Sequence, residues 1–150
     1  MIPKAIFVGQ TGKPNASDDQ ITLERSACFG TCPVYTLTIK SDGTVTFDGK
    51  RFTKTTGIAN GRISQGDFRA LVAEFVKIYY FSLPDAYTPG TKECPQRITD
   101  MPSANTSIRL NGRAKSVAHY YGCGTEGALE KLTALEKKID EVAGTEKWIK

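Results

Sequence analysis

Four cysteines are the residues of this chain whose chemistry can be anticipated most directly from their surroundings. Cys28 and Cys32 lie in the segment CFGTCP, Cys94 precedes a proline, and Cys123 stands between two glycines. Glycine and proline mark turns and loops, so all four are expected outside regular elements. A free cysteine that fills a core belongs on the apolar face of a strand or helix. Loop placement therefore indicates sulfur atoms that are bonded to a partner.

Disulfides are the favoured form of that bonding, and four cysteines allow three pairings. We favour Cys94 with Cys123, because this bridge would tether a long irregular connection to the start of the last helix. A cross-link of that span would contribute about 3 kcal/mol to stability. The choice leaves Cys28 with Cys32, across a short ring that is sterically allowed and more easily reduced.

Three other interpretations of the cysteines stay open. Zinc takes four thiolates in a tetrahedron and tolerates the C-x3-C spacing of Cys28 and Cys32, but Cys94 and Cys123 lie too far apart to form a matching pair. A redox pair is the second alternative, although activated thiols typically occur as C-x-x-C at a helix start. The third is four free thiols in a reducing cytosol.

Other candidate chemistry is sparse. Residues 122–127 match G-x-G-x-x-G between an expected strand and an expected helix, but a dinucleotide site needs a further parallel strand with an acidic residue. We interpret these glycines as a strand-to-helix turn. His119 is the only histidine, and a structural role is more common for a lone histidine than a catalytic one. No catalytic residue, metal or cofactor is assigned, and a non-enzymatic role is expected.

Charge and hydropathy limit the partners. The net charge is +4, from 20 basic and 16 acidic residues, and the basic residues are scattered along the chain. A nucleic-acid partner is therefore not expected. No apolar run reaches the roughly 18 residues of a membrane-spanning helix. Residues 1–8 are too briefly apolar for a signal peptide, so the protein is cytoplasmic or its leader, with any lipid anchor, has been removed.

Strand patterns begin at Ile21, and residues 1–20 are expected to form a flexible leader or an edge segment. A turn at residues 41–43 with a left-handed Gly43 predicts a hairpin that pairs Ile39 with Val45, and Leu37 with Phe47. A second turn, at Gly49-Lys50, would place Phe47 opposite Phe52. Apolar residues at alternate positions carry these strands: Ile21, Leu23, Tyr35, Leu37, Ile39, Val45 and Phe47.

Two helices follow. Ser64 is expected to cap the first, whose apolar stripe runs from Phe68 to Tyr79 and ends before Pro84. Residues 82–103 predict a long irregular connection. Strands near 105–110 and 115–121 flank Asn111-Gly112, and apolar matching favours Ile108 opposite Val117, although a two-residue turn would give another register. The last helix spans roughly 125–142 and ends at Gly144, and Trp148 is expected to fold back as an anchor.

Residues 21–150 therefore predict a single α+β domain. Its antiparallel sheet of five to six strands would carry two helices on one face, in the order βββ(β)-α-ββ-α.

The segment ITLERSACFGTCPVYTLTI, residues 21–39, carries the pattern C-x-G-x-C-P-x-Y ahead of the Asp42-Gly43 turn. It resembles a bacterial family of domains of unknown function, DUF6438. The resemblance covers roughly residues 20–149, and its less specific parts are these: Asp100-Met101-Pro102, Tyr120-Tyr121-Gly122, Leu135-x3-Ile139-Asp140 and Trp148. Cys94 and Cys123 are not part of the family pattern, which favours a second disulfide over a four-cysteine metal site.

The resemblance implies no activity, but many members follow lipoprotein or secretory leaders. It therefore implies a periplasmic or envelope location, with a cytoplasmic one as the alternative. We expect a non-enzymatic binding module for a protein or small ligand, and a thiol-redox or zinc protein is the alternative. The expected surface lies beside the 82–103 connection and comprises Phe29, Gly30, Pro33, Tyr35 and Tyr87.

Overall fold

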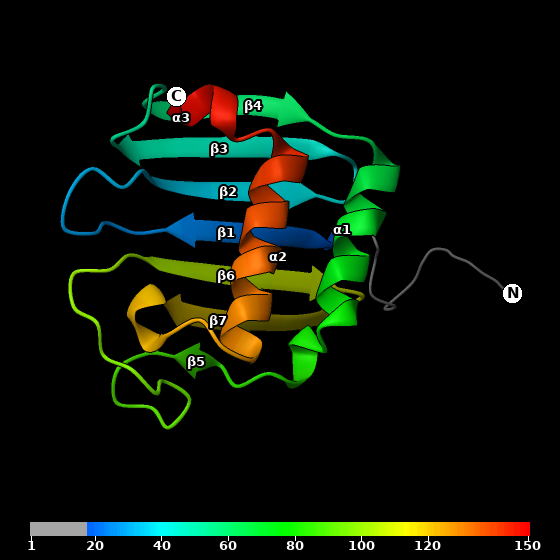
Figure 1. Ribbon diagram of the computed structural model, residues 1–150. Helices are drawn as coiled ribbons and strands as arrows, with labels where there is room; N and C mark the ends of the chain where they lie inside the picture. Colours follow the sequence, from blue (N-terminus) through cyan, green and yellow to red (C-terminus); the bar gives the residue numbers. More distant parts are fainter. Residues whose placement is uncertain (1–17) are drawn as a thin grey trace, which may run out of the picture.

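The computed structural model describes residues 18–150 and shows a seven-stranded sheet in the order β4-β3-β2-β1-β6-β7-β5 (Figure 1). All neighbouring strands are antiparallel except β5 and β7. The strands are β1 (Gln20–Arg25), β2 (Val34–Lys40), β3 (Thr44–Arg51), β4 (Gly57–Arg62), β5 (Ala86–Tyr87), β6 (Ser103–Leu110) and β7 (Arg113–Tyr120). The helices are α1 (Gln65–Lys77), α2 (Ala128–Ala143) and α3 (Glu146–Ile149), with 3-10 turns η2 (Tyr80–Ser82) and η3 (Tyr121–Cys123).

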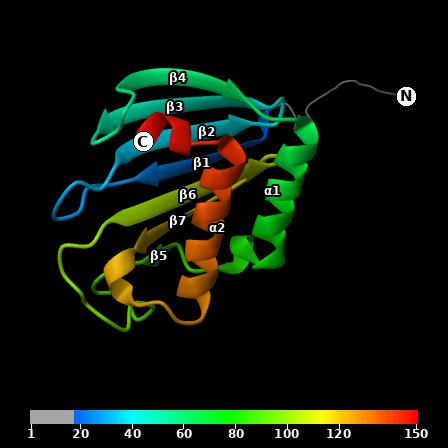
Figure 2. The same cartoon turned by 45° about the horizontal axis from the view of Figure 1, so that its top comes forward.

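Helices α1 and α2 lie across one face of the sheet, and Figure 2 shows both layers from a second angle. The core lies between these layers, where alternate residues of the central strands meet the apolar faces of the two helices. The large apolar residues of α1 and α2 buried there are Phe68, Leu71, Phe75, Leu129, Leu132, Leu135 and Ile139. The predicted α+β class is confirmed, while the sheet has one or two strands more than expected.

Several local predictions are confirmed. Ile39 pairs with Val45 and Leu37 with Phe47, around a turn in which Gly43 has φ +96°. The Ser64 side chain accepts a hydrogen bond of 2.9 Å from the Asp67 amide and caps α1. A left-handed Gly144 ends α2. These features depend on short-range patterns, which explains why the sequence alone reveals them.

The predicted Gly49-Lys50 turn is wrong, because β3 continues to Arg51 and Phe47 pairs with Ala59 instead of Phe52. Gly49 instead allows the backbone at Thr55 to approach β3 closely. A Cβ at this position would lie 2.1 Å from the Thr55 carbonyl oxygen. The chain reverses after Arg51, where Phe52 takes a positive φ of 57° and keeps its side chain half exposed.

The apolar match of Ile108 with Val117 is also wrong. Ile108 pairs with Lys115, because Asn111 and Gly112 form a two-residue turn with positive φ at both positions. This conformation is typical of a type I′ turn, which fixes the register of a hairpin. The turn conformation thus determines the register of this hairpin, in place of apolar side-chain matching. Lys115, opposite Ile108, donates to the Asp85 carboxylate at 2.6 Å.

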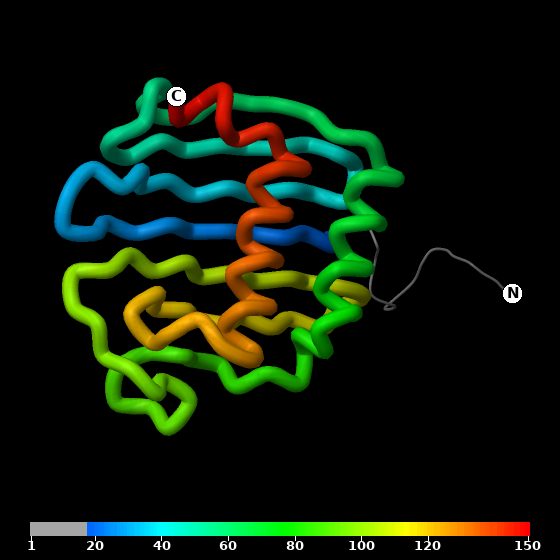
Figure 3. Tube along the Cα trace, viewed as in Figure 1, coloured from blue at the N-terminus to red at the C-terminus, as the bar shows by residue number. Residues whose placement is uncertain are grey.

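The 82–103 connection is less irregular than expected, because it contains β5, which pairs in parallel with β7. Two residues carry no detectable periodicity, so this strand leaves no signal in the sequence. Figure 3 traces the connection below the sheet, where it passes β5 and returns to β6.

At the other edge, Trp148 stacks on Phe47 with ring centroids 5.1 Å apart, as the anchor prediction required. None of the helices in residues 18–150 has the length and apolarity of a bilayer-spanning segment. Most of the predicted leader, residues 1–17, lies outside the described residues, and β1 already begins at Gln20.

Candidate binding surface at the disulfide loops

One transverse row of the sheet sets up the candidate site. Tyr35 pairs with Arg25, Arg25 with Ala104, and Ala104 with His119. The loops 26–33, 52–56 and 96–102 lie beyond this row, at the left end of the sheet in Figure 1. The register of the sheet therefore gathers segments from three separate parts of the chain at one end.

The loop between β1 and β2 is closed by a disulfide between Cys28 and Cys32. Phe29, inside this ring, exposes 84% of its surface. Its backbone amide donates to the Asp100 carbonyl at 3.2 Å, so the ring is tied to the end of the long connection. A large apolar side chain is thus displayed to solvent by a covalently closed loop.

The second disulfide joins Cys94 to Cys123, which is the pairing that we favoured from the sequence. Cys123 is fully buried and belongs to the core, so its loop position did not reveal its whole role. The Gln96 amide donates to the Cys123 carbonyl at 3.2 Å, and the Ile98 amide donates to the Gly122 carbonyl at 3.0 Å. Covalent and hydrogen bonds together hold residues 94–98 against Gly122 and Cys123 of η3.

Gly122 explains why glycines occur in the G-x-G-x-x-G segment. A Cβ at Gly122 would lie 2.1 Å from the Ile98 carbonyl oxygen, so only glycine permits this close approach. The glycine-rich segment therefore serves a turn and a backbone contact, in line with the interpretation as a strand-to-helix turn.

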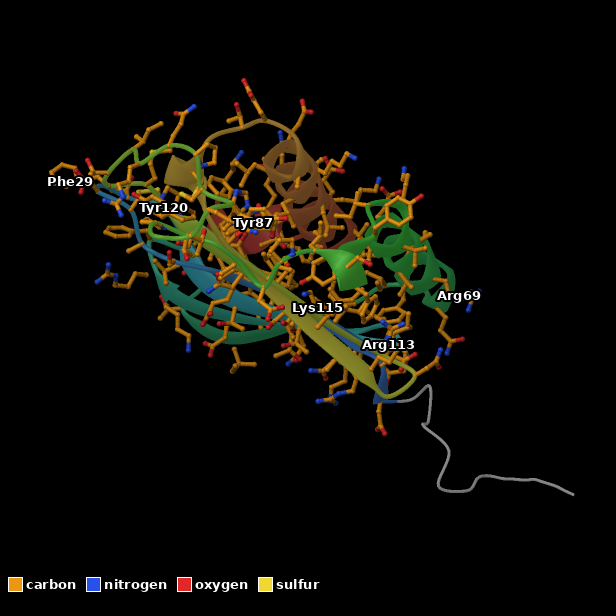
Figure 4. The ribbon with its side chains drawn as sticks, turned by 90° about the horizontal axis from the view of Figure 1, so that it is seen from below. Phe29, Arg69, Tyr87, Arg113, Lys115 and Tyr120 are labelled. Carbon is orange, nitrogen blue, oxygen red and sulfur yellow. A yellow bond between two sulfur atoms is a disulfide. The ribbon has the colours of Figure 1, made fainter. Side chains whose placement is uncertain are left out.

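Three exposed apolar side chains, Phe29, Ile98 and Met101, come from these two disulfide-bonded loops, and we call them the apolar tip. Ile98 exposes 48% and Met101 36% of its surface. The Tyr120 hydroxyl donates to the Ile98 carbonyl at 2.6 Å and accepts from the Met101 amide at 3.3 Å, which fixes the backbone between them. Figure 4 shows Phe29 at the extreme end of the molecule, opposite Arg69 and Arg113.

The structure exposes only some of the residues that the sequence predicted for the binding surface. Phe29 and Gly30 are exposed and Pro33 is half buried, but Tyr35 and Tyr87 are almost wholly buried and cannot belong to a surface. Tyr35 occupies an inward position of β2, and Tyr87 an inward position of the unforeseen β5. Ile98 and Met101 were missed, and their only signal was an apolar residue in a proline-containing polar stretch.

A network of polar side chains lies beneath the ring, between the transverse row and α2. Arg25 donates through Nε and Nη2 to Oδ2 of Asp140, at 3.0 and 2.8 Å. The Tyr35 hydroxyl donates to Oδ1 of Asp140 at 2.8 Å and accepts from Arg25 Nε at 3.1 Å. Arg25 directly precedes loop 26–33, so these bonds fix the base of the ring.

The network continues to the base of the second loop. Arg25 Nη1 donates to the Tyr121 hydroxyl at 3.1 Å, and this hydroxyl donates to Glu136 at 2.5 Å. His119 Nδ1 lies 2.7 Å from the other oxygen of Glu136, and both residues are buried. Tyr121 opens η3, which leads directly into Cys123. The same chain of hydrogen bonds thus supports both disulfide loops.

Burial and charge reinforce this network. Burial alone would lower the pKa of Arg25, but the Asp140 carboxylate raises it well above its ordinary value. Burial, followed by the charge of Glu136, raises the pKa of Tyr121 to about 12. Arg25 therefore stays charged and Tyr121 stays a hydrogen-bond donor throughout the ordinary pH range.

Of the network residues, only Tyr35 was singled out for the site from the sequence. Glu136 carried a signal, because it lies between Leu132, Leu135 and Ile139 on the apolar face of α2. Asp140 follows it by one turn and occupies the same side of the helix. A carboxylate within an apolar stripe predicts a buried partner.

Zinc binding through the cysteines is contradicted, since each sulfur is bonded to another sulfur. Within residues 18–150, no group of three or more histidine, cysteine or acidic residues is arranged to hold a metal. His119 Nε2 has no hydrogen-bond partner there, but only 1% of the residue is exposed. The structural interpretation of His119 is the better supported one.

A search of the curated proteins finds no match to the chain. The family model described as "Domain of unknown function (DUF6438)" matches residues 19–143, which include both disulfides, the apolar tip and every residue of the polar network. The chain therefore belongs to the DUF6438 family.

Proposed function

We propose that this protein is a non-enzymatic binding module of an oxidising, extracytoplasmic compartment, and that the apolar tip is its recognition surface. The observation that carries the proposal is the 84% exposure of Phe29 inside the Cys28–Cys32 ring. Burying an aromatic side chain contributes about 2 kcal/mol, so a partner that covers Phe29 gains this free energy.

The rigidity of the loops supports the same function. The ring is closed covalently, and the backbone around Ile98 and Met101 is fixed by Tyr120. A surface that is ordered before binding loses less conformational entropy when a partner arrives. Three exposed apolar side chains on ordered loops are therefore well suited to bind a partner.

The disulfides support the location. Structural disulfides persist in secreted and periplasmic compartments and are rare in the reducing cytosol. All four cysteines of the chain are bonded in pairs. An envelope location fits this chemistry, and the thiol-redox function is the alternative.

Photocrosslinking in the source cells tests the recognition surface. A photoreactive phenylalanine analogue replaces Phe29 or Ile98 in separate variants. A third variant carries it at Val76, which is 58% exposed on α1 and serves as the matched control. We expect one discrete adduct from positions 29 and 98 and none from position 76. Equal adducts at all three positions, or none at any, would contradict the proposal.

The oxidation state of the cysteines in the same cells tests the location. After acid quenching, a thiol-reactive polymer should shift the mass of the protein only if a reductant is added first. Four reactive thiols in the untreated sample would exclude an oxidising compartment. Reactive thiols confined to Cys28 and Cys32 would instead favour the thiol-redox alternative.

A further inference from the structure

Strand β4 forms one edge of the sheet, and within residues 18–150 no strand pairs with its outer side (Figures 1 and 2). Its pairing with β3 is regular from Gly57 to Arg62, without a bulge. The strand also lacks proline. Proteins usually protect edge strands by shortness, bulges, proline or inward charges, since free backbone groups attract other strands. The opposite edge is protected in this way, because β5 has only two residues.

The hydrogen bonds of the hairpin reveal which backbone groups of β4 are free. The Ile63 amide donates to the Gly43 carbonyl at 2.8 Å, so these two residues form a hydrogen-bonded pair. Such pairs alternate with non-bonded pairs along an antiparallel ladder. Ala59 and Gly61 therefore bond to β3, while Ile58, Asn60 and Arg62 direct their amides and carbonyls away from the sheet.

The side chains along this edge define the chemistry of a partner. On the open face, Ile58 is 62% exposed and Arg62 is also exposed. On the helix face, a Cβ at Gly61 would lie 3.0 Å from Trp148 and 3.8 Å from the Lys147 ammonium. Cations thus flank the end of the strand on both faces, and an apolar side chain marks its beginning.

We propose that the outer edge of β4 binds an extended, acidic peptide segment of a partner protein as an eighth strand of the sheet. The free groups of Ile58, Asn60 and Arg62 would supply the main-chain hydrogen bonds, as in other cases of strand addition. Carboxylates of the segment would face Arg62 and Lys147, and an apolar side chain would lie beside Ile58. This surface is separate from the apolar tip.

A second copy of the chain suits this edge less well. Pairing of two β4 strands would bring Arg62 and Lys147 of both copies to one interface six residues long. Like charges across an interface oppose association. An acidic segment meets the same cations with the opposite sign, so the charge distribution favours a different chain as the occupant.

Binding of synthetic peptides tests the proposal. The probe is a fluorescent ten-residue peptide of alternating valine and threonine in which two glutamates replace threonines, and the comparison peptide carries two lysines instead. We expect the acidic peptide to bind at least tenfold more tightly, as measured by anisotropy at low salt. In the Arg62→Glu/Lys147→Glu variant, the preference should reverse.

Two substitutions at Asn60 test the backbone contribution. Asn60→Pro removes an outward amide without removing a hydrogen bond to β3, which an edge strand tolerates. It should weaken acidic-peptide binding at least tenfold, whereas the matched control Asn60→Ala, which retains the amide, should stay within twofold. Thermal unfolding verifies that both variants fold. If Asn60→Pro does not fold, the charge-reversal variant provides the test.

Hydrogen exchange gives an independent signature. Without peptide, the amides of Ala59 and Gly61 should exchange slowly and those of Ile58, Asn60 and Arg62 rapidly, and bound peptide should slow the second group. Equal binding by Asn60→Pro and Asn60→Ala, or protection elsewhere, would overturn the proposal. Self-association of the wild type that Asn60→Pro abolishes would assign the edge to a second copy and would also overturn it.

Discussion

The two disulfide-bonded loops meet at one end of the sheet but are built differently. Cys94 and Cys123 join segments 29 residues apart, and Cys123 is buried in the core. Cys28 and Cys32 are 4 residues apart, and their ring projects an almost fully exposed Phe29. Loop-closure entropy grows with the length of chain that a bridge encloses. The first bridge is therefore placed to stabilise the fold, and the second to hold a side chain in position.

Removing each bridge tests this division directly. From loop length alone, Cys94→Ser/Cys123→Ser should lower the free energy of unfolding by about 3–4 kcal/mol, and Cys28→Ser/Cys32→Ser by about 2 kcal/mol. The buried position of Cys123 should widen the difference, because the substitution places a polar hydroxyl at a fully buried site of the core. Urea unfolding of both double variants measures it. A larger loss from the ring would reverse the assignment.

The two carboxylates of the network extend the comparison to the bases of the loops. Glu136→Ala should cost about 3 kcal/mol, because it leaves the buried Nδ1 of His119 without a partner and the Tyr121 hydroxyl without an acceptor. Asp140→Ala should cost less, about 1–2 kcal/mol, since the ion pair of Arg25 and Asp140 is partly exposed to water. The urea midpoints of the two variants decide the order. Equal losses would show that the two bases are supported alike.

Alkaline pH gives a smaller effect, in which Tyr121 reports on the base of the second loop. Because burial raises the pKa of Tyr121 to about 12, the unfolded chain ionises this phenol near pH 10, before the folded protein does. The stabilisation is complete below pH 10 and is lost as the pH rises towards 12.

Between pH 9.5 and 11.5, wild type should therefore lose about 1 kcal/mol more stability than Tyr121→Phe. Urea unfolding at both values measures this difference. The same substitution at Tyr80 provides the control. Burial also raises the pKa of Tyr80, but its hydroxyl bonds to Thr106, which lies outside the network. If Tyr121→Phe and wild type lost the same amount, Tyr121 would have no role in the pH dependence.

The sequence predicted those features that depend on neighbouring residues. The α+β class, the first hairpin, the Ser64 cap and the Trp148 anchor follow from periodicity and turn chemistry. The errors arose where two local rules competed or where the signal was too short. Gly49 was taken for a turn residue although it permits a close backbone contact, and β5 is only two residues long.

The candidate site was less predictable, because its parts come from distant segments. Loop placement of the cysteines led to the favoured pairing, but nothing in residues 94–102 showed that Ile98 and Met101 would be exposed on a segment bonded to the loop of Phe29. Tyr35 was assigned to the surface because its neighbours lie in a loop, whereas its inward position on β2 buries it. Arg25 and Asp140 meet only through the register of the sheet and the placement of α2.

The central claim is that the ring displays Phe29 to a partner and that Phe29 itself does not stabilise the fold. Substitution of Phe29 by serine tests this claim most directly. Phe29 is almost fully exposed and is not one of the buried core residues, so the free energy of unfolding should change by less than about 0.5 kcal/mol. In the same variant, the photocrosslinked adduct from position 98 should disappear. A loss of stability well above this value, or an adduct that persists at full yield, would contradict the proposal that the ring presents Phe29 to a partner.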